Sequence, residues 1–191
     1  MLHGDPQVRH YLADIIRDRQ LIVDLQPGNM VDRNSRTVEL QVPIGCYPVV
    51  PPKVDAPDAL FRMLQKETAS GTDCTLPEEV RAFWTQANKE LKTLQPIQAE
   101  GVEPMLPIDD DTNDGIVNTN RQVLRRSGAL ANTVQCRRLV VGDHLDVAGH
   151  FGPLGHDAGL LRSGAGFGDP QFKALYRDVA QFIAKVMANA P

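Results

Sequence analysis

A short apolar run near the end of the chain constrains the fold more than any other feature. In "QCRRLVVGDH", Leu139–Val141 form a β-branched run without polar alternation, and the run stops at Gly142, Asp143 and His144. Such a run predicts a strand that is buried on both faces, as strands are in a parallel sheet covered by helices. With helices predicted before and after this strand, the sequence favours the α/β class.

Helical periodicity supports this fold class. The clearest helix is the last one, for which Asp169 is the expected N-cap and Pro170 lies in the first turn, followed by a single apolar stripe. The other expected elements are helices over 6–17, around 60–64 and over 77–94, and strands over Val38–Val42 and near Met105–Ile108.

The bulk composition points to one globular domain, residues 1–191. The chain has 191 residues, of which 42% are hydrophobic and 23% charged, as in ordinary globular proteins. The net charge of -4 is spread without a basic run, so a nucleic-acid partner is not expected. No apolar run approaches the roughly 20 residues of a transmembrane helix, and the first residues do not resemble a signal peptide. The cellular compartment does not follow from these features.

The three cysteines, Cys46, Cys74 and Cys136, are widely spaced and include no Cys-X-X-Cys pair. This pattern excludes a zinc ribbon or a dithiol redox motif. One disulfide between Cys46 and Cys74 stays open as an alternative for an oxidising compartment.

Two polar loops carry the candidate chemistry. Asp114 lies in an Asn-Asp-Gly turn signal, and His144 follows the predicted buried strand with Asp143 and Asp146 beside it. Taken separately, the first is an ordinary turn and the second a histidine satisfied by a local carboxylate. Functional groups of open α/β sheets gather beyond the carboxyl ends of the strands, so we expect these loops to meet. An aspartate there would fix the imidazole tautomer and stabilise the imidazolium.

The stretches "NDGIVNT", "VVGDHLDVAGH" and "SGAGFGDPQFKALYRDVAQFI" resemble the C-terminal half of bacterial lipases and esterases of the α/β-hydrolase fold. The resemblance runs loosely from about residue 20 onward and is most specific in the two polar loops. It implies that Asp114 is the acid and His144 the base of a catalytic triad. It also implies a partial α/β-hydrolase fold, with the C-terminal strands of a mainly parallel sheet and a helical lid over about 55–100. The implied substrate is a small-molecule ester or a lipid.

The third triad member is missing from the pattern. The family places its serine in a Gly-X-Ser-X-Gly elbow, and none of Ser35, Ser70, Ser127 and Ser163 has that context. We therefore expect a truncated hydrolase that is inactive until an N-terminal half or a second chain supplies the nucleophile. An unpaired sheet edge would favour self-association. The alternative is a non-catalytic binding or structural domain derived from a hydrolase.

Metal sites are weaker expectations, and no cofactor is expected. The resemblance makes Asp146 a calcium candidate, but His150 stands where those lipases place a glutamine and is a poor ligand for a hard cation. A zinc site on His144, Asp146, His150 and His156 is a further alternative, although the Gly-rich spacing lacks a helical histidine pair.

Overall fold

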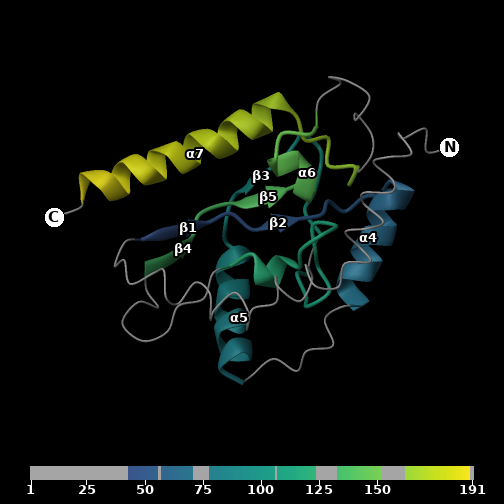
Figure 1. Cartoon of the computed structure of the whole chain (residues 1–191), viewed down its shortest axis with the longest axis horizontal. Coiled ribbons are helices and arrows are strands. Elements are labelled where there is room, and N and C mark those ends of the chain that lie inside the picture. Colours follow the sequence, from purple (N-terminus) through teal and green to yellow (C-terminus); the bar gives the residue numbers. More distant parts are fainter. Residues whose placement is uncertain are drawn as a thin grey trace.

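The computed structural model describes residues 43–55, 57–70, 78–105, 107–123, 133–151 and 162–189. The helix expected over 6–17 and the strand expected over Val38–Val42 lie outside these ranges. Figure 1 shows short strands at the centre of the molecule with helices around them.

The named strands of the described residues form one two-stranded and one three-stranded sheet, and both are parallel. The strand β1 (Ile44–Cys46) pairs with β4 (Val134–Cys136), and β5 (Leu139–Val141) lies between β2 (Val49–Val50) and β3 (Pro96–Ile97). All three residues of β5 are buried, as the unalternated apolar run predicted. The α/β class is therefore confirmed.

The prediction of a strand near Met105–Ile108 is wrong, because the described residues of that stretch form no strand. The strand on this side of β5 is β3, which comes earlier in the chain. The Met105 N–H instead donates to the Pro51 carbonyl at 2.8 Å, beside an antiparallel bridge between Pro52 and Pro104. This stretch covers the chain just after β2.

The helices match the periodicity of the sequence, with one correction at a cap. The elements are α4 (Ala59–Ser70), α5 (Glu78–Leu91), the 3-10 turn η1 (Thr119–Arg121), α6 (His144–Val147) and α7 (Asp169–Ala188). The N-cap of α7 is Gly168 rather than Asp169, and the Gln171 side chain accepts a hydrogen bond from the Gly168 N–H at 3.1 Å. None of the described helices has the length and apolar character needed to cross a membrane.

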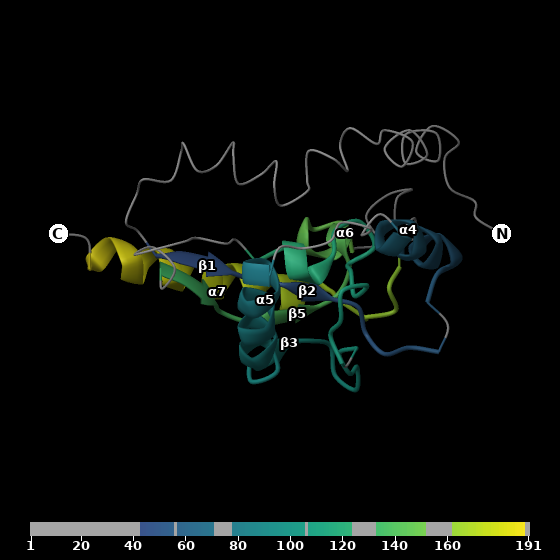
Figure 2. The same cartoon turned by 90° about the horizontal axis from the view of Figure 1, so that it is seen from below.

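The helices α5 and α7 lie on opposite sides of the strands (Figures 1 and 2). A hydrogen bond of 2.9 Å from the Tyr47 hydroxyl to Asp178 ties α7 to the segment between β1 and β2. Phe182 packs close to the glycine of β1, because a Cβ at Gly45 would lie 3.0 Å from its ring. The glycine thus lets α7 approach the sheet closely.

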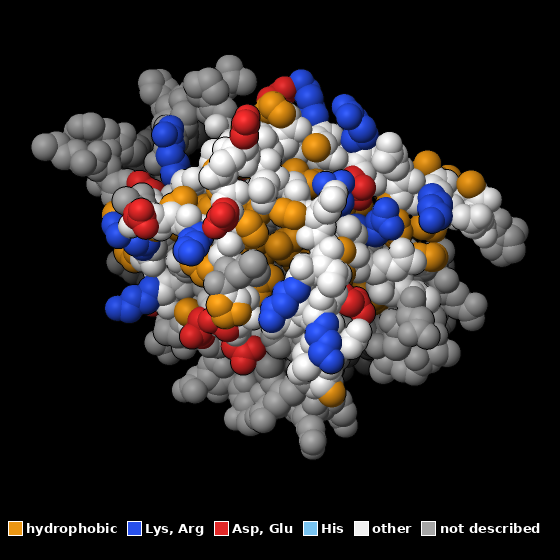
Figure 3. Space-filling view, turned by 180° about the vertical axis from the view of Figure 1, so that it is seen from behind, with side chains coloured by type: hydrophobic (Ala, Val, Ile, Leu, Met, Phe, Trp, Pro, Cys, Tyr) orange, Lys and Arg blue, Asp and Glu red, His pale blue; other side chains and the backbone are white. Residues whose placement is uncertain are grey.

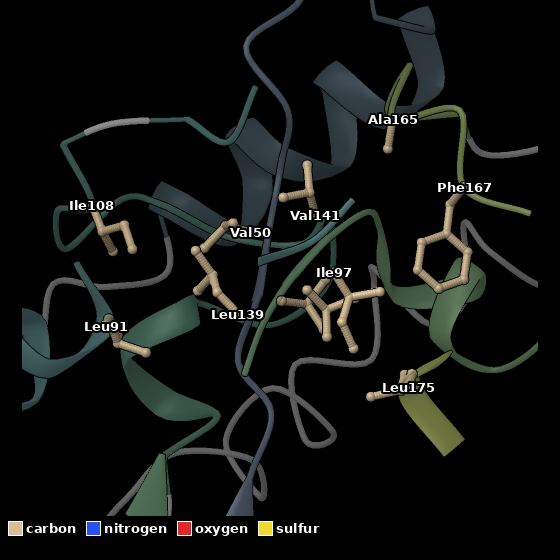
Figure 4. Close-up of a cluster of buried hydrophobic side chains, with 11 residues drawn as sticks. Val50, Leu91, Ile97, Ile108, Leu139, Val141, Ala165, Phe167 and Leu175 are labelled. Atoms are coloured by element: carbon tan, nitrogen blue, oxygen red, sulfur yellow. The ribbon is translucent and has the colours of Figure 1, made fainter. Parts of the chain in front are cut away.

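The main core forms where strands, helices and the loop before α7 meet (Figure 4). Its buried members are Val49, Val50, Leu91, Ile97, Ile108, Leu139, Val140, Val141, Ala165, Phe167 and Leu175. Val50, Val140 and Val141 are completely inaccessible to solvent. Each such side chain contributes roughly 1.5–3 kcal/mol through burial. The end of β5 that leads to His144 is therefore firmly held.

The edge of β2 that faces away from β5 is covered by polar side chains. The Val49 N–H donates to the Gln122 Oε1 at 2.6 Å, and the Val49 carbonyl accepts from the Thr119 hydroxyl at 2.8 Å. Both side chains come from η1 and the residue after it, which follow the Asp114 turn. The acid-bearing connection thus closes the edge at Val49, while self-association elsewhere stays a prediction.

Figure 3 shows the face behind the view of Figure 1, where hydrophobic side chains gather near the centre with Lys and Arg side chains around them. The self-association expected from the sequence involves an unpaired sheet edge, and it stays a prediction.

Cys46 and Cys136 are register partners across β1 and β4. Cys74 lies outside the described residues, so the disulfide between Cys46 and Cys74 stays a prediction.

Leu91→Ala tests the core. Leu91 is 1% exposed at the end of α5, so its truncation should lower the free energy of unfolding by about 2–5 kcal/mol. Urea denaturation followed by circular dichroism measures this loss. The control Met187→Ala removes a side chain that is 71% exposed and should change the value by less than about 0.5 kcal/mol. Equal effects of the two variants would contradict the described core.

Candidate active site

Asp114 lies on a tight turn that uses its own side chain. The Asp114 N–H donates to the Val117 carbonyl at 3.1 Å. The Asp114 Oδ1 in turn accepts from the Ile116 N–H at 3.0 Å and the Val117 N–H at 2.7 Å. Gly115 adopts φ +97°, a left-handed conformation that explains the glycine of the Asn-Asp-Gly signal. Asp114 is 1% exposed, so its position is set by the fold.

His144 is the first residue of α6, directly after β5. Asp143 is the N-cap, and its side chain accepts from the Leu145 and Asp146 N–H groups at 2.9 Å each. The Asp146 side chain accepts from the Asp143 N–H, which completes a capping box. This short helix therefore fixes the direction in which the histidine leaves the backbone.

The structure brings Asp114 and His144 together through two contacts. The His144 Nδ1 lies 2.9 Å from the Asp114 Oδ2, and the His144 backbone N–H donates to the Asp114 carbonyl at 3.0 Å. Their side chains are exposed to different degrees, 42% for His144 and 2% for Asp114. The carboxylate is buried and the imidazole reaches the surface.

The pKa of His144 is raised above its usual value. The main cause is the hydrogen bond to Asp114, which outweighs the opposing effect of burial, and the charges of Asp114 and Asp143 act in the same raising direction. A carboxylate bonded to Nδ1 holds the proton there and leaves Nε2 as the basic nitrogen. Among the described residues, none forms a hydrogen bond with Nε2. The pair can thus accept a proton from a group that approaches Nε2.

Two buried carboxyl groups, those of Asp143 and Asp146, flank His144 in the chain. Asp143 and Asp146 are 1% and 8% exposed, and burial raises the pKa of both. The pKa of Asp146 reaches about 8, chiefly through burial and then through the charge of Asp143. Asp143 accepts three backbone N–H groups, from Leu145, Asp146 and Ser163, which favour its charged form. We therefore place the shared proton on Asp146.

The calcium site at Asp146 stays a prediction. Calcium prefers several oxygen donors, and the Asp146 side chain accepts a hydrogen bond from the Asp143 N–H at 2.9 Å. Within the described ranges, no group of three or more His, Cys, Asp or Glu residues could hold a metal ion. His156 lies outside those ranges, so the zinc alternative also stays a prediction.

No described serine side chain contacts the His144 ring through a hydrogen bond. Ser163 is 2% exposed, and its hydroxyl accepts from the Ala165 N–H at 3.2 Å. Ser35 and Ser127 lie outside the described residues.

Gln122 also belongs to this site, although no sequence pattern pointed to it. The Gln122 Nε2 donates to the Asp114 Oδ2 at 3.1 Å. Neither Asn118 nor Thr119 caps η1 through its side chain, because Asn118 donates to the Asp110 carbonyl and Thr119 to that of Val49. These roles depend on tertiary contacts, and the local spacing of residues in the sequence does not reveal such contacts.

Comparisons with known proteins add no relative: no family model matches the chain, and no curated protein or solved structure matches it either.

Asp114→Asn tests the origin of the raised His144 pKa. The main raising contact disappears with the charge, so the pKa of His144 should fall. An NMR titration of the ring protons measures this value. Asp111→Asn is the control, because Asp111 is an exposed neighbour whose side chain does not contact His144. An unchanged pKa in Asp114→Asn would contradict the observed pairing.

Asp146→Asn tests the buried carboxyl pair. A carboxyl with a raised folded pKa contributes stability that is fully present below its unfolded pKa, near 3.8, and is lost as the pH rises through the folded pKa of about 8. Asparagine mimics the neutral form at every pH. At pH 9 the variant should therefore melt about 2–4 °C above wild type, the effect of about 1 kcal/mol in a chain of this length. If the difference in melting temperature between the variant and wild type stays constant from pH 5 to pH 9, the carboxyl pair holds no proton in this range.

Proposed function

We propose that Asp114 and His144 are the acid and base of a carboxylic ester hydrolase of the lipase or esterase type. In this mechanism a serine hydroxyl attacks the ester carbonyl while the His144 Nε2 takes its proton. His144 then returns that proton to the leaving alcohol, and water releases the acyl group by the same two steps. Asp114 would orient the ring and stabilise the imidazolium.

The observation that carries the proposal is the 2.9 Å contact between Asp114 Oδ2 and His144 Nδ1, with the ring half exposed on its other side. That distance is what an acid and a base of a triad require. The chain order Asp then His is that of α/β-hydrolases. The α/β class and the position of His144 directly after a buried parallel strand are consistent with the same assignment.

The helix α4 contacts both loops of the pair and is our candidate for the lid or acyl pocket. Phe61 and Leu64 are buried there, and Leu145 of α6 packs against them. Directly after Leu64, the Gln65 carbonyl accepts from the Asn113 side chain at 3.0 Å. Its Met63 side chain is 47% exposed and would be available to an acyl chain. Simple packing of α4 against the two loops explains the buried contacts equally well.

The proposal requires a serine from another polypeptide or from the chain's own undescribed residues. Because no serine of the sequence lies in a Gly-X-Ser-X-Gly elbow, we place the nucleophile and most of the oxyanion hole on an N-terminal half encoded elsewhere. Calcium and other cofactors have no part in the proposed steps.

The second candidate is a non-catalytic binding or structural domain. Two facts favour it: the missing elbow, and the engagement of the Ser163 hydroxyl within its own loop. In that case Asp114 and His144 would serve only to join their two loops.

A two-polypeptide assay tests the hydrolase. The chain is co-produced with the polypeptide encoded directly upstream of it, and the complex is treated with a fluorophosphonate and with short p-nitrophenyl esters. We expect one labelled serine and ester hydrolysis that falls about 10³-fold or more in His144→Ala.

His150→Ala is the matched control, because His150 is an exposed histidine close to α6. It should keep both labelling and hydrolysis. If no serine of either polypeptide is labelled and no ester is hydrolysed, the hydrolase is rejected and the binding domain is preferred.

A further inference from the structure

Gln122 joins three parts of the site with one side chain. Its Oε1 accepts from the Val49 N–H at 2.6 Å, and its Nε2 donates to the Asp114 Oδ2 and to the Val117 carbonyl, both at 3.1 Å. One amide thus contacts the edge of β2, the triad acid and the turn that carries this acid. It uses one acceptor and both donors.

These partners settle which way the amide points. The Val49 N–H is a donor and can face only an oxygen, whereas Asp114 and Val117 present acceptors. A reversed amide would set its NH₂ group against the Val49 N–H and leave an oxygen beside the Asp114 carboxylate. The Nε2 donor is therefore directed at Asp114.

The carboxylate of Asp114 has a second anchor besides its own turn. The turn holds Oδ1 through the Ile116 and Val117 N–H groups, which already limits rotation of the carboxylate. Gln122 bonds Oδ2, the same oxygen that faces the His144 Nδ1. With both oxygens held, the carboxylate plane is fixed toward the ring.

We infer that Gln122 is a positioning residue that orients the Asp114 carboxylate toward His144 and thereby selects the ring tautomer with a proton on Nδ1. The inference rests on the proposed function, since this tautomer leaves the Nε2 lone pair for the serine proton. Gln122 itself contacts no reacting atom.

A purely structural role would be to cap β2, because Gln122 also bonds Val49. Thr119 separates the two roles: its hydroxyl bonds the carbonyl of the same Val49 and makes no hydrogen bond to Asp114. Thr119→Val therefore removes a bond from the strand edge and leaves the carboxylate untouched.

The test is the tautomer ratio of His144, read from ring ¹⁵N chemical shifts above its pKa in the full chain. This readout needs no nucleophile and no turnover. In wild type we expect the Nδ1–H form to exceed the Nε2–H form by about tenfold or more. In Gln122→Met, which has a similar length but no donor, the ratio should fall at least about threefold, whereas Thr119→Val should keep the wild-type ratio.

The outcomes separate the two proposals. A wild-type ring in the Nε2–H form would overturn the acid–base pair itself, and this inference with it. A wild-type ring in the Nδ1–H form with an unchanged ratio in Gln122→Met would overturn only the role of Gln122. An equal fall in Thr119→Val would show that the strand edge controls the ratio, which also overturns it.

Gln122→Asn covers the case in which Gln122→Met does not fold. Asparagine keeps a polar amide at this half-buried position but is one methylene too short to bond Val49 and Asp114 together. The same fall in ratio is expected. A folded Gln122→Asn protein with the wild-type ratio would reject the inference.

Discussion

The Asp114 carboxylate is the point on which the candidate site depends. Its Oδ1 accepts from the backbone N–H groups of Ile116 and Val117. Its Oδ2 faces the Gln122 Nε2 and the His144 Nδ1, so the four contacts fill the lone-pair positions of the carboxylate. These donors belong to its own turn, the segment after η1 and the start of α6. A buried carboxylate without such donors would cost several kcal/mol. One desolvated charge therefore joins its own turn to two later segments, which lie 8 and 30 positions further along the chain.

The packing of β5 explains why His144 can complete this set. Val140 and Val141 are fully buried in the centre of the sheet, so the chain leaves it at a fixed point. Gly142 allows the Asp146 side chain to fold back, because a Cβ there would lie 3.1 Å from the Asp146 Oδ2. The capping box of α6 then fixes the backbone of His144. Core packing and helix capping together supply the precision that a general base needs.

Sequence reasoning found the elements with local signatures. The unalternated run at Leu139–Val141 gave the buried strand, and the apolar stripe gave α7. Asp114 and His144 were identified from turn chemistry and a strand exit, and the structure places them in contact.

What sequence reasoning missed depends on tertiary contacts. Gln122 and Val49 are 73 positions apart, and no local pattern marks a glutamine that will bridge a strand edge and a carboxylate. The strand near Met105–Ile108 failed for a related reason: proline at both 104 and 107 breaks the stretch, and β3 takes the place beside β5. The burial of Asp146 beside Asp143 is likewise a property of the fold that local spacing does not show.

The unequal exposure of the pair bears on whether it acts in chemistry or only in structure. A contact that merely joins two loops gains most when both partners are buried and fully bonded. Here the acid is 2% exposed with every acceptor used, while the base is 42% exposed and uses only Nδ1 among the described residues. A fully braced acid that orients a half-exposed imidazole has the arrangement of a general base. The cost of burying a charge falls on Asp114, and the half-exposed ring is the feature that supports the proposed role of His144 as a general base.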